Sequence, residues 1–173
     1  MTANMKFHFK TQINPQTLTE PLWKDRIERW YQLDVASLVM CQAIYEWQKN
    51  KINFILPDVI IYEFNKGSNF ADHEYAKLTD PSPAKFVYTL PNIPIAAAQQ
   101  LLKISVPAFC VSNLKIQMNS KLNWLVEHLV KKYTSVLALN LIPPTTDGGQ
   151  LWTVSAHIYQ LCHDHKESSH AES

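Results

Sequence analysis

Two runs of consecutive apolar residues constrain the fold more than any other feature of the sequence. The first lies within residues 58–64 and the second spans residues 136–142. Apolar side chains on consecutive positions are typical of strands that are covered on both faces, as in a parallel sheet between layers of helices. Stretches with helical spacing lie between and around these runs. The sequence therefore predicts an α/β fold with a mostly parallel sheet and flanking helices.

The remaining elements are predicted from periodicity and from capping residues. Further strand patterns occupy residues 6–10 and 108–112, and residues 151–161 have a mixed apolar spacing that fits a strand or a helix, with the strand favoured. The first of them alternates polar and apolar residues, as a half-buried edge strand does. Helical spacing predicts helices over 22–31, 35–49, 95–104 and 121–133, with Asp34, Asn92 and Asn119-Ser120 as caps, and a short helix over 70–78.

The composition fits one globular domain. The chain has 173 residues, of which 46% are apolar and 18% charged, and its formal net charge is +1. A chain of this length can bury about two-thirds of its unfolded surface, so its core needs no disulfide or metal. The nearly neutral charge disfavours binding to nucleic acid or to a membrane surface. We expect one domain over 1–161 and a polar, disordered tail over 162–173.

The cysteines and the lengths of the apolar stretches indicate a cytoplasmic protein. Cys41, Cys110 and Cys162 lie far apart and are odd in number, which favours a reducing compartment. The N-terminus lacks the continuous apolar segment of a signal peptide, so we expect it to be unprocessed. The longest apolar stretches are much shorter than the ~18 residues that cross a bilayer. We therefore expect no membrane insertion.

Glycine is scarce, with three residues against ten prolines. Phosphate-binding loops use glycine because its small size lets backbone N–H groups approach the anion closely. Neither the GxGxxG nor the GxxxxGK[ST] pattern occurs in the chain. We expect no nucleotide bound by these routes and no other cofactor.

Residues with metal-binding or acid–base chemistry favour structural or surface roles. The segment 162–165, Cys-His-Asp-His, contains the ligand types of zinc or nickel. A solvated tail is favoured over a metal site, because no helix or loop anchors a pair of ligands. His73 lies between Asp72 and Glu74 but has no identifiable nucleophile beside it. A surface position is favoured for His73 and also for His128.

Cys110 lies inside the predicted strand 108–112. A thiol in a buried strand usually behaves as a small hydrophobe, and this interpretation is favoured over a nucleophile. A nucleophilic cysteine is expected at the end of a strand, where the N-terminus of the next helix lowers its pKa. Residues 113–118 occupy that junction and include no Cys, Ser or Thr.

Four aromatic residues lie at helical spacing within residues 23–47. They are Trp23, Trp30, Tyr31 and Trp47. Few basic residues lie between them, so packing in the core or against a partner is favoured over stacking on nucleic acid.

One segment resembles the β-ketoacyl synthase family. Residues 82–98 contain a Ser-Pro pair, aromatic residues and a Leu-Pro-Asn stretch that runs into a helix of small residues, as in members of that family. Upstream, residues 26–61 and Gly67 resemble the family's early helix and the strand that ends in glycine. Downstream, residues 105–112 resemble the strand that delivers the nucleophile, with Val106 where glycine is usual. The resemblance spans residues 22–142 and implies half of a thiolase-like fold, similar to the divergent members of aryl polyene-type pathways.

The resemblance also implies that the catalytic machinery is incomplete. Family enzymes place a nucleophilic cysteine shortly after the strand, and Cys110 comes several residues too early. The catalytic histidines come from a C-terminal half, for which this chain is too short. Chain length factors, the inactive partners of some ketosynthases, commonly carry glutamine at the vacated position, and Gln117 lies near it. We assign no catalytic residue, and Pro91, Asn92, Cys110 and Gln117 are the candidates for partner or acyl-pocket contacts.

Three functional hypotheses remain open from the sequence. The favoured one is a non-catalytic subunit of fatty-acid or polyketide-type synthesis that dimerises with an active ketosynthase or binds an acyl carrier protein. It predicts that the Pro91-Asn92 region and the helix over 121–133 face the partner. The second is an acyl-transfer enzyme with a degenerate site built on Cys110 or His73. The third is an unrelated α/β binding protein.

Overall fold

The core of the fold is a five-stranded mixed sheet. The computed structural model describes residues 3–50, 55–64, 77, 90, 92–112, 118–144 and 150–161. The strand order is β1-β5-β4-β2-β3. The strands are β1 (Ala3–Ile13), β2 (Val59–Phe64), β3 (Ala108–Ser112), β4 (Ser135–Ile142) and β5 (Trp152–Leu161). β2 lies parallel to both β3 and β4, whereas β5 lies antiparallel to both β4 and β1.

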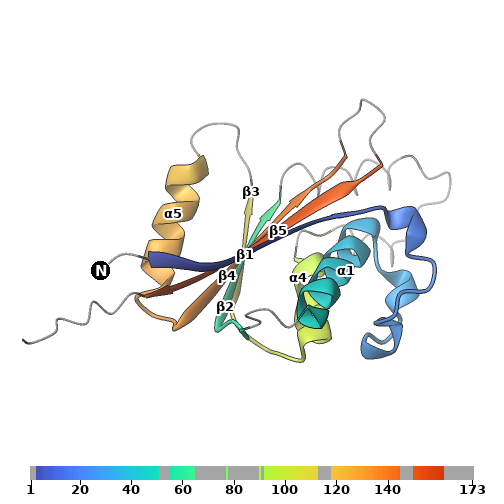
Figure 1. The fold of residues 1–173 in the computed structure, drawn as a ribbon, viewed down its shortest axis with the longest axis horizontal. Helices are drawn as coiled ribbons and strands as arrows, with labels where there is room; N and C mark the ends of the chain where they lie inside the picture. Colours follow the sequence, from blue (N-terminus) through green and yellow to red (C-terminus); the bar gives the residue numbers. More distant parts are fainter. Residues whose placement is uncertain are drawn as a thin grey trace, which may run out of the picture.

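Helices cover both faces of this sheet. On one face lie α1 (Val35–Lys49) and α4 (Ile93–Leu102), and on the other lies α5 (Met118–Leu129), as Figure 1 shows. The predicted α/β fold with flanking helices is confirmed. The predicted mostly parallel sheet needs a refinement, because β5 runs against the direction of its two neighbours. The sequence of a ten-residue strand does not show whether the strand pairs with its neighbours in the parallel or the antiparallel direction.

α1 begins and ends at the predicted residues. The Asp34 carboxylate accepts a hydrogen bond of 3.0 Å from the Ser37 backbone N–H, which satisfies one of the unpaired donors of the first turn. Burial raises the pKa of the Asp34 carboxyl, although its hydrogen bonds oppose this effect. At the other end of the helix, the Trp47 ring stacks on Phe7 of β1 at 5.8 Å between centroids. α1 thus ties the β1 side of the sheet to the main core.

α4 lies two residues earlier than predicted. It starts at Ile93 because Pro94, which lacks an N–H donor, fits the first helical turn. Asn92 occupies the cap position, yet its side chain makes no capping hydrogen bond. The helix ends at Lys103, which has the left-handed backbone conformation (φ 56°) common just beyond a helix end.

The predicted helix over 22–31 is wrong. The structure has two separate 3₁₀ turns there, Lys24–Arg26 and Trp30–Gln32. Ile27 between them is extended, and Arg29 has a left-handed backbone with φ 57°, so no continuous helix can form. The spacing of the apolar residues is still used for packing, since Trp23 and Ile27 are buried. Tertiary contacts have overridden the local helical pattern.

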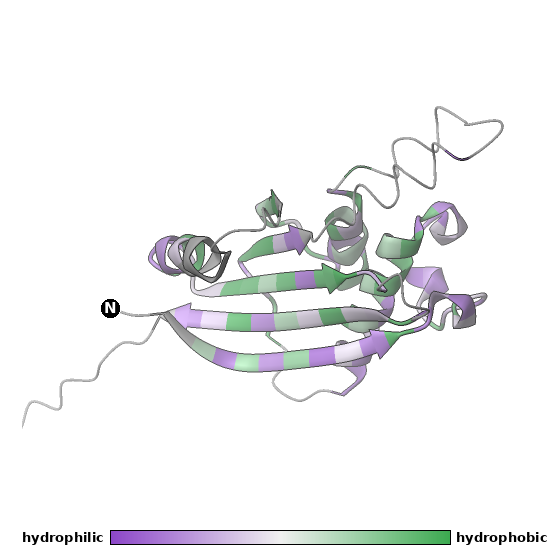
Figure 2. Cartoon of the chain, turned by 90° about the horizontal axis from the view of Figure 1, so that it is seen from above, coloured by the Kyte–Doolittle hydropathy of each residue, from purple (hydrophilic) through white to green (hydrophobic). Residues whose placement is uncertain are grey.

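The two faces of the sheet differ in their coverage. The larger core lies on the α1 and α4 face and includes Ile60, Tyr62 and Leu137 of the central strands. A smaller cluster lies on the α5 face, where Val126, Leu129 and Val130 pack on Val59, Ile61 and Val136. Figure 2 shows hydrophilic and hydrophobic residues alternating along β1 and β5, whereas β4 is mostly hydrophobic. β1 and β5 therefore have one polar face, whereas the central strands β2 and β4 are apolar on both faces except at Glu63 and Asn140.

The remaining predictions concern four strands, two helices and the C-terminal tail. The strands over 6–10, 108–112, 136–142 and 151–161 are all present, the first extended to eleven residues. The last helix starts and ends earlier than predicted, at Met118 and Leu129. The expected short helix over 70–78, apart from Lys77, and the expected tail over 162–173 lie outside the described residues.

Candidate functional site

The β3 edge of the sheet is the first candidate site. β3 is the last strand in the sheet order and pairs with β2 on one side. Ala108, Phe109 and Cys110 are exposed on it, with 40% of the Phe109 surface accessible. Phe109 pairs in register with Ile61 of β2 and therefore lies on the α5 face. The edge combines a short strand with exposed apolar side chains. Such an edge can pair with a strand of another chain.

Cys110 is exposed, so the expectation of a buried cysteine is wrong. It pairs in register with Tyr62, whose side chain belongs to the main core, and thus lies on the α1 and α4 face at the sheet edge. Partial burial raises the pKa of the Cys110 thiol. A raised pKa leaves less thiolate at neutral pH, and the thiolate is the nucleophile. The environment of Cys110 therefore does not activate it.

Of the other predicted contact residues, only Asn92 lies in the described part of the chain. Asn92 is exposed at the start of α4. Pro91 and Gln117 lie outside the described residues, as do His73 and the segment 162–165. The structure thus does not bring the four candidates together into one described site.

α5 presents an aromatic surface, as the favoured hypothesis requires of a partner-facing helix. Trp124 is 64% exposed, and its ring stacks on His128 at 5.6 Å between centroids. His128 is exposed, as predicted.

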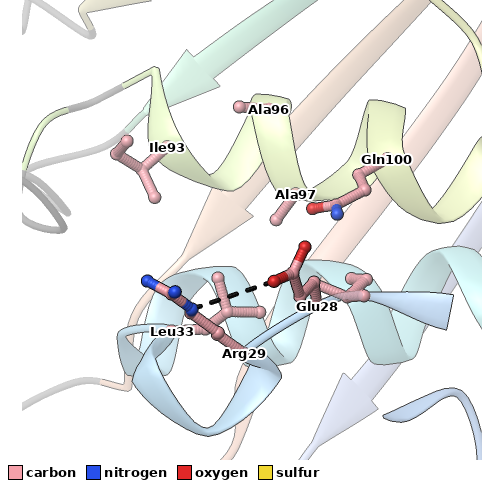
Figure 3. A pocket seen from close by; sticks show the side chains of 8 residues that line it. Glu28, Arg29, Leu33, Ile93, Ala96, Ala97 and Gln100 are labelled. Atoms are coloured by element: carbon pink, nitrogen blue, oxygen red, sulfur yellow. Dashed lines mark ion pairs between the residues drawn. The ribbon is translucent and has the colours of Figure 1, made fainter. Parts of the chain in front are cut away.

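A cavity of about 350 Å³ lies between the residue 27–33 segment and α4. Its floor is apolar and its rim carries Glu28, Arg29 and Gln100. Figure 3 shows the side chains of Glu28 and Gln100 directed toward the same space from opposite walls, with Arg29 toward the Ile93 end. The Arg29 Nε and Glu28 Oε1 atoms are 3.9 Å apart, which is a loose ion pair. Sequence reasoning missed this cavity because it predicted a helix over one of its walls.

A chain of polar contacts fixes that wall on α1. The Trp23 indole N–H donates to Gln42 Oε1 at 3.0 Å, and Gln42 Nε2 donates to Glu46 Oε1 at 3.0 Å. Thr11 of β1 then donates to the other Glu46 oxygen at 2.9 Å. The Arg26 guanidinium lies over the Tyr45 ring at 5.3 Å. The segment is therefore held in place although it is not a helix.

A row of polar residues crosses the sheet on the α5 face. Lys10, Ser155, Asn140 and Glu63 are register partners on four successive strands. Asn140 Nδ2 donates to Glu63 Oε2 at 2.6 Å, and Glu63 is only 8% exposed. The Asn140 Oδ1 atom is buried and accepts no hydrogen bond from the part of the chain that the structure describes. The burial of Glu63 was not predicted. The only sign of it in the sequence was the position of this single charged residue within an apolar run.

Two histidines form a pair in the neighbouring row. His8 and His157 face each other across β1 and β5, with ring centroids 4.4 Å apart and nearly parallel planes. His157 Nδ1 lies 3.3 Å from the Met5 sulfur. Burial, and next the neighbouring His8, lower the pKa of His157.

Neither a metal-binding cluster nor a membrane-spanning helix is found among the described residues. Among the described residues, no cluster of three or more His, Cys, Asp or Glu side chains could hold a metal ion. No helix in the described part of the chain combines the length and apolarity needed to cross a bilayer.

Comparison with known proteins identifies the fold. Neither a protein-family model nor a curated protein matches the chain. Among solved structures, it matches one chain of the complex between the ketosynthase ApeO and its chain length factor ApeC from Xenorhabdus doucetiae, with a TM-score of 0.64 and 13% identity. That match covers 95% of this chain and 81% of the other. The chain has the fold of one chain of this ketosynthase and chain length factor complex.

A second structure supports the same ketosynthase-like fold. The ishigamide ketosynthase/chain length factor matches with a TM-score of 0.53 and 10% identity. The match covers 89% of this chain but 49% of that chain, so the present chain corresponds to about half of it. The resemblance inferred from residues 22–142 is therefore confirmed at the level of the fold.

Proposed function

We propose that the chain is a non-catalytic, chain-length-factor-like subunit that pairs with an active ketosynthase through the β3 edge. The observation that carries the proposal is the exposed apolar edge of β3, in a fold shared with complexes of a ketosynthase and its chain length factor. Adding a partner strand there would bury Phe109 and satisfy the outward backbone groups of β3. The partner would supply the nucleophile and the acyl group would be held between the two chains.

The properties of Cys110 support a non-catalytic role over the alternative of a degenerate acyl-transfer enzyme. The thiol lies within the strand, not at a helix N-terminus, and burial raises its pKa. Both features disfavour the thiolate that attacks an acyl thioester. The fold likeness, in turn, disfavours the hypothesis of an unrelated α/β binding protein.

The pathway and the remaining partner belong to the same proposal. An aryl polyene-type or other polyketide-type pathway fits the nature of the matched structures. An acyl carrier protein would then deliver the chain to the assembled pair, in the cytoplasm. Trp124 on α5 is a suitable contact for either partner because it is a large exposed aromatic side chain.

The pairing is tested by purification of the tagged chain from its native host, followed by mass spectrometry and a mass measurement of the complex. The proposal predicts a ketosynthase in a 1:1 complex. Phe109→Asp should weaken that complex at least about 100-fold, because it places a charge in the centre of the interface. Leu22→Asp is the matched control, since Leu22 is 77% exposed and lies outside β3. A clean monomer, or a complex insensitive to Phe109→Asp, would contradict the proposal.

The absence of an activated nucleophile is tested separately by thiol labelling. The rate at which a thioester acylates Cys110, with release of the thioester's own thiol, should be lower at pH 7 than the rate for free glutathione and should rise with pH. A Cys110→Ser variant identifies the labelled site. Rapid, stoichiometric acylation of Cys110 at neutral pH would favour the acyl-transfer alternative.

A further inference from the structure

Two non-glycine residues in the described part of the chain have positive φ, and both are basic. They are Arg29, with φ 57°, and Lys103, with φ 56°. This conformation is unfavourable for a residue with a side chain, so each case calls for a structural reason.

The reason is clear for Lys103. It follows the last residue of α4, and its backbone N–H bonds to carbonyls of the last helical turn. A left-handed residue at this position is a common way to end a helix. No such helix end precedes Arg29, which lies between two short 3₁₀ turns.

Arg29 differs from Lys103 in a second way, because it lines the cavity of about 350 Å³ against α4. Backbone strain concentrates at ligand-binding positions, where it aims a side chain that a relaxed backbone would direct elsewhere. The volume of the cavity lies at the lower end of the range of small-molecule sites.

The floor of the cavity suits an apolar chain. Ile27 and Ala97 are buried, and Leu33 packs against the main core. Alanine at positions 96 and 97 keeps the α4 wall low, so that the space is not filled by a longer side chain.

The rim of the cavity suits an amide head group. The Arg29 guanidinium donates hydrogen bonds only, the Glu28 carboxylate only accepts them, and the Gln100 amide does both. Because the Glu28 and Arg29 atoms are 3.9 Å apart, their ion pair is longer than a hydrogen bond and leaves both groups available. A primary amide offers a carbonyl acceptor to Arg29 and N–H donors to Glu28.

We propose that this cavity binds small primary amides that carry an apolar chain. A carboxylate of the same chain length gains an ion pair with Arg29 but is repelled by Glu28, and an amine gains an ion pair with Glu28 but is repelled by Arg29. A neutral amide uses both groups without repulsion, so it is favoured over either. This inference goes beyond the pairing proposed for β3. Phe109→Asp should therefore leave amide binding unchanged, and the two proposals can fail independently.

The test compares hexanamide, hexanoate and hexylamine, which share an alkyl chain and differ in the head group. Each is titrated into the ¹⁵N-labelled full chain, and backbone amide shifts are followed for residues 27–33 and 93–100. Hexanamide should bind in the millimolar range, as expected for about eight non-hydrogen atoms. The other two probes should bind about fivefold or more weakly, because each pairs with only one of the two charged groups and meets a like charge at the other.

Two variants and one control locate the site. Arg29→Gly keeps a residue that tolerates positive φ and removes the guanidinium, so hexanamide affinity should fall about fivefold without loss of the fold. Glu28→Gln should increase the affinity for hexanoate. Lys103→Gly is the matched control, since it replaces the other left-handed basic residue and should leave binding unchanged.

The inference is overturned if hexanamide produces no shifts in the two walls up to its solubility limit. It is also overturned if the three probes bind equally, because the head group is then not recognised. Equal loss of binding in Arg29→Gly and Lys103→Gly would likewise show that Arg29 has no specific role.

Discussion

The two edges of the sheet present opposite surfaces to a partner. The β1 edge has eleven residues and exposes Lys6, His8 and Lys10. The β3 edge has five residues and exposes Ala108 and Phe109. Charged side chains, lysine above all, protect long edge strands from pairing with other chains. The comparison indicates that β1 is protected from pairing with another chain, whereas β3 is suited to such pairing.

The edges also differ in how they are held. β1 pairs with β5 along nearly its whole length and is tied to α1 through the Phe7–Trp47 stack and the Thr11–Glu46 hydrogen bond. β3 pairs with β2 at the short register from Ala108 to Ser112. A weakly held strand with an apolar edge gains most from an added partner.

The largest effect is expected at the anchor of the β1 edge. Trp47→Ala should lower the free energy of unfolding by about 3–5 kcal/mol, because Trp47 is fully buried and its removal leaves a cavity beside Phe7. Urea denaturation of the purified chain measures this change. Phe109→Asp is the comparison and should cost less, about 1–2 kcal/mol, because part of the Phe109 side chain is already exposed. A loss of less than 1 kcal/mol for Trp47→Ala would show that the β1 side is not anchored as described.

A smaller effect is expected between the edges, in the polar row. Asn140→Ala should cost about 2 kcal/mol, because it leaves the buried Glu63 carboxylate without the hydrogen bond of 2.6 Å. Ser155→Ala in the same row is the control and should cost less than about 0.5 kcal/mol. Thermal or urea unfolding distinguishes the two variants. Equal stability of both would mean that Glu63 is satisfied by other groups.

The smallest effect is a pH dependence at the β1 edge. Burial and then His8 lower the pKa of His157 below its ordinary value of 6.5, so the unfolded chain binds a proton more readily than the folded one. The stabilising contribution is complete above pH 6.5 and is lost as the pH falls through the folded pKa. His157→Gln should therefore flatten the decline in stability below pH 6.5. An unchanged decline in His157→Gln would contradict this assignment.

Local signals in the sequence predicted most elements. The bounds of α1 and β3 match the predictions, because Asp34 is a strong cap and Pro107 marks the start of a short strand. The buried strands β2 and β4 were recognisable from their consecutive apolar residues. These features depend on residues close together in the chain.

Non-local features could not be predicted. The segment around Arg29 has helical spacing, but its packing on α1 through Trp23 and Gln42 decides its conformation. Cys110 lies in an apolar run that suggests burial, and the strand order alone makes it exposed. The cavity at Arg29 could not be predicted either, because the turns that form one of its walls were predicted as a helix.

Hydrogen exchange of the chain, alone and in complex with the co-purified ketosynthase, tests the central claim most directly. The account predicts slower exchange of the backbone amides of residues 108–112 in the complex, with little change over residues 3–13. Protection of β1 with no protection of β3 would contradict it, because the partner would then lie at the wrong edge of the sheet.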